Sequence, residues 1–308
     1  MIHTQDLTRV FERPKAEPLT AVAGLSIDVA RGEIFGFLGP NGAGKTTTIR
    51  MLSALIQPTA GEAVVNNYRV GEQNDEIRRS VGLLTETPGM YDRLSAEYNL
   101  RLFAKLYGVE DVDGQVEKYL RMMGLWERRG DVVGGFSKGM RQKLALARAL
   151  LHEPDLVFLD EPTAGLDPEA AHMVREYIRQ LKAQGRTVFL CTHNLDEADR
   201  LCDRIAVFKT RLLVMDTPAN LRRKLFGRRV VFHLATDAAA FTPAVQDFPF
   251  VQEIQVVDNK LVVRLDDPDT QNPQLIRALV NAGAAIQFVG ELRYSLEDIY
   301  LQLMEQSK

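Results

Sequence analysis

The chain has 308 residues, which is long enough for two domains that each bury a core of their own. Its composition is 45% hydrophobic and 26% charged with a formal net charge of -3, so it lacks the basic excess of a dedicated nucleic-acid binder. No window reaches the about 18 uncharged apolar residues of a membrane-spanning helix, and residues 1–6 do not begin a signal peptide. These features predict a cytosolic two-domain protein without a nucleic-acid partner.

The first part of the chain predicts a mixture of strands and helices. Residues 19–29 alternate apolar and polar side chains, which is typical of antiparallel strands with one solvated face. A buried strand is expected over residues 33–38, then a glycine-rich loop and a helix over residues 45–55. From about Ser95 to His152 the apolar spacing is helical, which predicts an inserted helical subdomain within about residues 87–152.

The strand pattern then returns. Residues 156–159 and 188–190 are expected to be buried strands on either side of an amphipathic helix over residues 168–184. This βαβ spacing is typical of a parallel sheet, so the core is predicted to be an open α/β sheet.

A second series of elements follows Pro218 and a short basic helix over residues 221–225. We expect three strands, a helix opened by Pro273, a fourth strand over residues 285–289 and a last helix whose Ser295 start is a capping box. The three strands are placed at residues 230–234, 251–257 and 261–265. The predicted domains are therefore residues 1–225 and 226–308, the second a small α+β domain of ferredoxin-like type.

The loop after the first buried strand has the pattern of a phosphate-binding loop, and it reads Gly39-Pro40-Asn41-Gly42-Ala43-Gly44-Lys45-Thr46. Its glycines let successive backbone N–H groups point at phosphates, and the following helix N-terminus adds positive potential. Lys45 is expected to reach the β- and γ-phosphates of ATP, and the Thr46 hydroxyl to bind Mg²⁺. Thr47 is included in the predicted ATP site.

Two carboxylates, Asp160 and Glu161, end the buried strand at residues 156–159. Ligands of open α/β sheets lie at the carboxyl ends of the strands. We expect Asp160 to hold the Mg²⁺ side of the site and Glu161 to orient and deprotonate the attacking water. A strand that simply ends in solvated acids is the alternative, and the phosphate-binding loop makes it the weaker one.

With these motifs in this order, residues 1 to about 225 resemble the ABC (ATP-binding cassette) transporter ATPase family. The resemblance implies an α/β P-loop NTPase (RecA-like) core with an N-terminal antiparallel β subdomain and an inserted helical subdomain, followed by the small α+β domain. It also implies that Phe11 stacks on adenine, that His193 points at the γ-phosphate, and that residues 164–168 lie along a dimer seam. For Phe11 and His193, the alternative is a purely structural role in the core.

The family signature Leu-Ser-Gly-Gly-Gln is represented by Phe136-Ser137-Lys138-Gly139-Met140. In that family Ser137 and Gly139 would contact the ATP held by an opposite subunit. Ser137 is a good N-cap, and the basic Lys138 and Arg141 at a helix N-terminus suggest an anion arriving from outside. An exposed basic turn is the alternative, and Lys138 and Met140 depart from the family residues.

Glu86 stands where the family has a glutamine. A carboxylate can accept a hydrogen bond from Mg²⁺-bound water but donates one only when protonated, so Glu86 is included in the predicted nucleotide and metal site. The segment after Glu86, the signature variant and the Ser-Leu-Glu-Asp start of the last helix resemble the drug-resistance exporter branch.

The sequence therefore predicts the ATP-hydrolysing subunit of an ABC exporter, a homodimer that closes around two ATP molecules and drives a separate membrane permease. Such a subunit would be cytoplasmic and peripheral on the inner face of the cell membrane, docked through residues 86–99 and the inserted helices. The alternative is a soluble ABC ATPase acting on ribosomes or DNA. The second domain is expected to brace the dimer, or alternatively to bind a small regulatory ligand.

Overall fold

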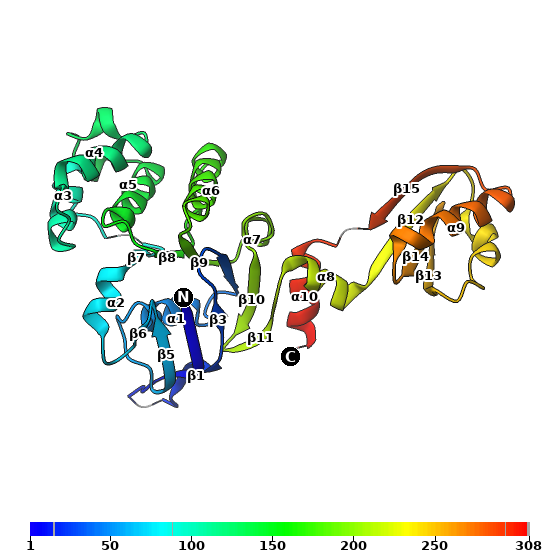
Figure 1. Cartoon of the computed structure of the whole chain (residues 1–308), viewed down its shortest axis with the longest axis horizontal. Coiled ribbons are helices and arrows are strands. Elements are labelled where there is room, and N and C mark those ends of the chain that lie inside the picture. Colours follow the sequence, from blue (N-terminus) through cyan, green and yellow to red (C-terminus); the bar gives the residue numbers. More distant parts are fainter. Residues whose placement is uncertain (15, 88, 293, 307–308) are drawn as a thin grey trace. The chain divides into compact units, whose positions relative to one another are not determined.

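The computed structural model describes residues 1–14, 16–87, 89–292 and 294–306 of the chain. Pro88, in the predicted loop after Glu86, and Arg293, before the predicted last helix, lie outside the described residues. The chain divides into two compact units, Met1–Thr217 and Pro218–Lys308 (Figure 1). Within the described ranges, every helix is too short or too polar to cross a membrane.

The division falls at Thr217 rather than at residue 225. The reason is that helix α8 (Pro218–Phe226) packs against helix α10 (Leu296–Gln306) of the second unit. The rings of Phe226 and Tyr294 stack with their centroids 4.0 Å apart. The basic helix expected near residue 221 therefore starts the second unit.

The first unit begins with an antiparallel sheet in the order β2-β1-β5-β6, with β3 beside β1. Apolar side chains such as Leu7 and Val22 are fully buried on its inner face, while its outer face is polar. The expected antiparallel subdomain is confirmed. Its strands are β1 (Ile2–Phe11), β2 (Leu19–Leu25), β3 (Asp28–Val29), β5 (Ala60–Val65) and β6 (Tyr68–Arg69).

A second sheet has the order β11-β10-β4-β9-β8-β7, in which β11 alone runs antiparallel to its neighbour among the described strands. Its central strands are buried along their whole length, and Phe37, Phe158 and Phe189 form one aromatic cluster there. This is the expected open α/β sheet. Its strands are β4 (Ile34–Leu38), β7 (Val81–Leu84), β8 (Leu156–Asp160), β9 (Thr187–Thr192), β10 (Arg204–Lys209) and β11 (Arg211–Asp216).

Helices cover this core and form the inserted subdomain, in which α3, α4 and α5 pack against one another (Figure 1). Side chains fix several helix starts: Ser137 Oγ accepts from Met140 N at 3.2 Å and Asp167 Oδ1 accepts from Ala170 N at 2.8 Å. The helices of the first unit are α1 (Lys45–Leu52), α2 (Asn74–Ser80), α3 (Ala96–Leu106), α4 (Val112–Met122), α5 (Lys138–Leu150), α6 (Pro168–Ala183) and α7 (Leu195–Leu201).

The second unit contains a sheet in the order β13-β14-β12-β15, so that β14 lies between β12 and β13. This is the split arrangement of a ferredoxin-like domain, with the 3₁₀ segment Ala238–Ala244 in place of the first helix. The predicted capping box is confirmed, since Ser295 N donates to Asp298 Oδ2 at 2.8 Å and Asp298 N donates to Ser295 Oγ at 3.1 Å. The elements are β12 (Arg228–Leu234), β13 (Val251–Val257), β14 (Lys260–Leu265), α9 (Pro268–Asn281) and β15 (Ile286–Leu292).

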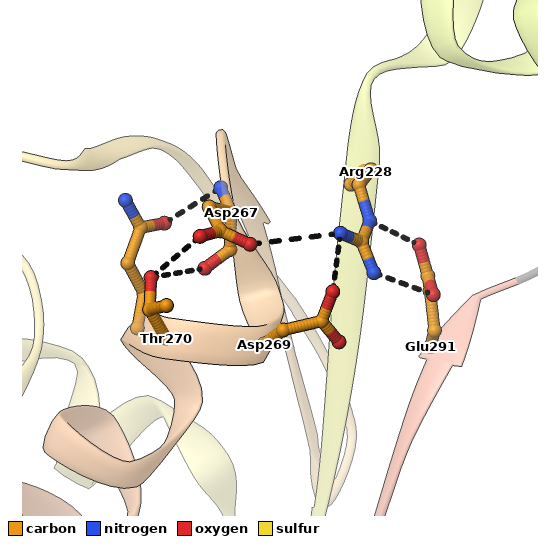
Figure 2. Close-up of polar contacts among 6 residues, drawn as sticks. Arg228, Asp267, Asp269, Thr270 and Glu291 are labelled. Carbon is orange, nitrogen blue, oxygen red and sulfur yellow. Dashed lines mark hydrogen bonds and ion pairs between the residues drawn. The ribbon is translucent and has the colours of Figure 1, made fainter.

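Helix α9 begins at Pro268, so the prediction that Pro273 opens it is wrong. A proline at the first helical position loses no hydrogen bond, because its N–H would have no intrahelical acceptor. Figure 2 shows how this start is held: Arg228 forms a bidentate pair with Glu291 at 2.8 and 3.2 Å and reaches Asp269 at 3.0 Å. The arginine thereby ties the first turn of α9 to strands β12 and β15.

Candidate active site

The loop between β4 and α1 has a backbone that requires glycine. Gly42 and Gly44 have φ values of +79° and +105°, in the left-handed region that other residues avoid. A Cβ at Gly44 would also overlap the carbonyl oxygen of Ala21. The loop therefore turns tightly onto the N-terminus of α1, where Lys45 Nζ donates to the carbonyl oxygen of Gly39 at 2.6 Å. Its backbone N–H groups at that helix end form an anion-binding site.

Asp160 and Thr46 meet at the floor of the site. Thr46 Oγ1 donates to Asp160 Oδ2 at 2.8 Å, and Asp160 is only 1% exposed. Burial raises the pKa of the Asp160 carboxyl, and so do the negative charges of Glu161 and Glu86, whereas the Thr46 hydrogen bond and the charge of Lys45 lower it. The local excess of carboxylates creates a site that a cation would stabilise.

Glu161 follows β8 in an unusual backbone conformation. Its φ is +51°, which costs a non-glycine residue roughly 1–2 kcal/mol. Strain of this kind persists where the surrounding structure enforces it, and here Glu161 N donates to the carbonyl oxygen of Cys191 at 2.9 Å. The strain turns the carboxylate away from the strand direction and into the cleft.

The Glu161 carboxylate has two basic neighbours. Its Oε1 atom lies 2.8 Å from His193 Nδ1 and 3.8 Å from Lys45 Nζ. Although these are ion-pair distances, neither contact is aligned as a hydrogen bond, and Oε1 is a buried atom without a hydrogen-bond partner among the described residues. The carboxylate therefore lies beside two basic groups at the wall of the site, with Oε1 not committed to a hydrogen bond among the described residues.

These side chains share one cleft of about 450 Å³. Its volume is within the usual range for small-molecule sites, roughly 300–1,000 Å³. Thirteen of the residues predicted from sequence line it, and they are Phe11, Pro40, Asn41, Gly42, Ala43, Gly44, Lys45, Thr46, Thr47, Glu86, Asp160, Glu161 and His193.

Three predicted residues lie elsewhere. Gly39 is buried beneath the cleft and presents its carbonyl oxygen to Lys45. Ser137 and Gly139 lie at the start of α5 and do not line the cleft of their own chain. Arg141 was expected to face an anion from outside the chain. Its guanidinium instead forms an ion pair with Asp92 of the same chain, at 2.8 Å.

Sequence reasoning missed other residues of the cleft wall, namely Leu19, Thr20 and Ala21 on β2, Ala164, and Thr210 between β10 and β11. The alternating pattern of residues 19–29 predicted the strand but gave no sign that it borders the phosphate-binding loop. That contact depends on long-range bonds, such as Thr210 N to the Ala43 carbonyl oxygen at 2.9 Å.

Two family models match this chain. The model described as ABC transporter matches residues 22–164, and the model described as ATP-binding protein DrrA1-3-like, C-terminal domain, matches residues 217–304. The chain is also 35% identical to the bacitracin transport ATP-binding protein of Bacillus licheniformis over 305 residues, which are 99% of this chain and 97% of the relative. The chain belongs to the ABC transporter ATP-binding family.

Other relatives of this ABC ATPase include a fluoroquinolones export ATP-binding protein of Mycobacterium tuberculosis, 43% identical with 75% of each chain covered. A daunorubicin resistance ATP-binding protein of Streptomyces coeruleorubidus is 36% identical, with 92% of this chain and 90% of the relative covered. Members of the family bind and hydrolyse ATP to drive transport, and this chain is such an ATPase.

Solved structures agree with the fold. The ATP-binding subunit of an ABC transporter is 33% identical with a TM-score of 0.66, over 73% of this chain and 93% of that chain. A dimeric ATP-binding cassette in a post-hydrolysis state with ADP and Pi shares the fold, at 24% identity and a TM-score of 0.65, over 70% of this chain and 98% of that chain.

Proposed function

We propose that this ABC ATPase powers an exporter by closing as a homodimer around two ATP molecules and reopening after hydrolysis. A separate membrane permease would convert that motion into transport and would hold the chain at the cytoplasmic face of the membrane. The observation that carries the proposal is the convergence of Lys45, Asp160, Glu161 and His193 in one cleft. Export is supported by the names of the relatives, which refer to fluoroquinolone export, bacitracin transport and daunorubicin resistance.

In this proposal each residue of the cleft has one task in hydrolysis. Lys45 and the backbone N–H groups of residues 41–47 hold the phosphates, and the Phe11 ring stacks on adenine. Glu161 orients the attacking water and accepts its proton, since Glu161 lines the cleft and its Oε1 atom has no hydrogen-bond partner among the described residues. His193, at 2.8 Å from the same oxygen, keeps that carboxylate in place and contacts the γ-phosphate.

The residues present also fit a magnesium ion. Mg²⁺ is usually bound by one or two protein oxygens together with substrate phosphates and water, and the Thr46 hydroxyl and Asp160 carboxylate offer such a pair. In the described part of the chain, no three His, Cys, Asp or Glu side chains could hold a metal ion by themselves. We infer that Thr46, Asp160 and Glu86 would hold the ion, which would neutralise phosphate charge when bound.

The start of α5 is proposed to complete the site of the second copy. Ser137 caps the helix, and the free N–H groups of its first turn attract an anion. Because Ser137 and Gly139 do not line their own chain's cleft, they are available to the ATP of an opposite subunit. A complete site would then need two chains.

The permease is proposed to dock on residues 86–99 and the inserted helices, where Tyr91 and Tyr98 are more than half exposed. Large exposed aromatic side chains are typical of protein interfaces. The second unit is proposed to brace the dimer. An ATPase acting on ribosomes or DNA is not favoured, because the names of two relatives above refer to fluoroquinolones export and bacitracin transport.

The decisive experiment measures the molecular mass of the Glu161→Gln variant with and without ATP, together with ATP hydrolysis by the wild type and the variant. We expect the variant to bind ATP, to form dimers only with ATP, and to hydrolyse it about 10²–10⁴-fold more slowly. The matched control is Glu169→Gln, at the exposed start of α6, which should behave as the wild type.

Two outcomes would count against the proposal. ATP binding without dimerisation would exclude the homodimer and would point to a different partner cassette. Hydrolysis at the wild-type rate by Glu161→Gln would remove Glu161 from the mechanism.

A further inference from the structure

Behind the cleft lies a second buried carboxyl group, Glu197, to which the mechanism above gives no task. It is in the first turn of α7, is 2% exposed, and does not line the cleft. Its backbone N–H donates to the Asn194 side chain at 3.0 Å, which caps the helix. Burying a carboxyl group is costly unless it is hydrogen-bonded or neutral, so its partners decide what it does.

The Glu197 carboxyl is linked to the catalytic Glu161 through one hydroxyl group. Thr192 Oγ1, at the end of β9, is fully buried and lies 3.2 Å from Glu197 Oε2 and 3.4 Å from Glu161 Oε2. The same hydroxyl oxygen accepts from Asn194 N at 3.0 Å. A chain of two carboxyl groups and one hydroxyl therefore runs from α7 to the cleft.

The number of hydrogen atoms limits how these three hydrogen-bonded groups can work together. A threonine hydroxyl has one hydrogen to donate, but both carboxyl groups are within its reach. If Glu197 is ionised, the two carboxylates compete for that hydrogen. If Glu197 is protonated, it donates to Thr192, and the Thr192 hydrogen is then free for Glu161. Only the second arrangement gives each of the two contacts at Thr192 Oγ1 a hydrogen atom of its own.

The surroundings shift the Glu197 carboxyl toward its protonated form. Burial raises the pKa of the Glu197 carboxyl, and the charge of Glu161 adds to this, while Thr163, Thr192 and Arg175 lower it. Of the strands that pack on α7, β4 carries no ionisable side chain, and β9 carries Cys191, a buried thiol whose pKa is raised by burial. Helix α6 contributes Arg175, and Cys202, at the end of α7, is a buried thiol whose own pKa is raised by burial and by Glu197.

We propose that Glu197 is a positioning residue for ATP hydrolysis, which in its protonated form passes a hydrogen bond through Thr192 to Glu161. This inference rests on the proposed role of Glu161. The hydrogen bond holds the catalytic carboxylate toward the cleft. Loss of the Glu197 proton draws the Thr192 hydrogen to Glu197 and leaves Glu161 facing a second negative charge. The rate of hydrolysis therefore falls as pH rises through the titration of Glu197.

The test compares the full-length wild type with Glu197→Gln, whose side-chain amide can donate to Thr192 at every pH. We expect similar kcat values, within about twofold, at the acid end of the activity profile, and a wild-type rate that falls about 3- to 10-fold further than the variant's as pH rises. Asp196→Asn is the matched control, because it removes an exposed carboxylate from the same helix turn and should keep the wild-type profile.

A second variant tests the route through Thr192. Thr192→Val removes the hydroxyl with little change in volume and should lower kcat most at low pH, where Glu197 is protonated in the wild type and the link to Glu161 is intact. Adding Glu197→Gln to it should then change neither the rate nor its pH dependence, because the link is already broken.

Each result separates this inference from the function itself. A pH profile of Glu197→Gln identical to the wild type, or additive effects of the two substitutions, would overturn the inference while leaving Glu161 as the proposed base. Unimpaired hydrolysis by Glu161→Gln would instead overturn the proposed role of Glu161.

Discussion

The side chain of Lys138 lies on the backbone of Gly165, so closely that a Cβ at position 165 would overlap its ammonium group. Lys138 is the first residue of α5, and Gly165 belongs to the loop that follows Glu161. Lysine replaces the glycine usual in the family signature, and here its long side chain fills the space over Gly165. The proposed seam and the signature segment are thus in contact within a single subunit.

Replacing Gly165 by alanine should destabilise the chain in two ways. Its φ of +66° costs a residue with a Cβ roughly 1–2 kcal/mol, and the new Cβ displaces Lys138. In urea unfolding, Gly165→Ala should lower the free energy of unfolding less when Lys138 is also replaced by glycine. Gly185→Ala is the matched control, since Gly185 has φ +81° and open space around it. Equal costs for the two alanine substitutions would mean that Lys138 moves away freely.

The phosphate-binding loop could be predicted from sequence because its function depends on neighbours along the chain, Gly39 to Thr46. Asp160 and Glu161 could be predicted because a buried parallel strand ends there. Contacts such as Lys138 on Gly165, or Thr192 Oγ1 on Glu161, join segments that are distant in the sequence and leave no local pattern. In the sequence, Glu197 cannot be told from the exposed acidic residues that are common in the first turn of a helix. The start of α9 was missed because two prolines, Pro268 and Pro273, give the same signal.

Arg148 is expected to stabilise the loop after Glu86. It lies in α5, donates to the carbonyl oxygen of Gly89, and covers the Phe103 ring at 4.8 Å, while burial lowers its pKa. Arg148→Met keeps the apolar stem but removes both polar contacts. We expect a loss of about 1–3 kcal/mol in the free energy of unfolding, measured with urea.

The control for Arg148 is Arg141→Met on the same helix. It breaks a largely exposed ion pair with Asp92, which is typically worth about 0–1 kcal/mol. A smaller effect of Arg148→Met than of Arg141→Met would show that Arg148 does not anchor the loop.

His152 should make the fold sensitive to mild acid. Its ring stacks on Tyr107 with centroids 4.1 Å apart, and Nε2 lies 3.1 Å from the Val81 carbonyl oxygen, so Nε2 carries the hydrogen. Burial lowers the pKa of His152 in the folded chain, and Nδ1 is buried without a partner among the described residues. The unfolded chain therefore binds a proton more readily, and stability decreases as pH falls below about 6.5.

Thermal unfolding between about pH 7.5 and pH 5.5 tests this, with His152→Gln as the variant. The variant should lose less stability on acidification than the wild type. Exposed His172→Gln is the matched control and should follow the wild type. An unchanged pH dependence in His152→Gln would assign the acid sensitivity to other groups.

The division of the chain at Thr217 predicts how shortened chains behave. A chain ending at Thr217 removes α8 together with its partner α10, whereas a chain ending at Phe226 keeps α8 alone. Leu221, fully buried in the whole protein, and the Phe226 ring stacked on Tyr294 would then face water. We expect the chain that ends at Phe226 to bind more hydrophobic dye, and to aggregate at lower concentration, than the chain that ends at Thr217. Both chains should bind ATP. Equal dye binding would mean that α8 folds onto the first unit, and the boundary would then lie at residue 225.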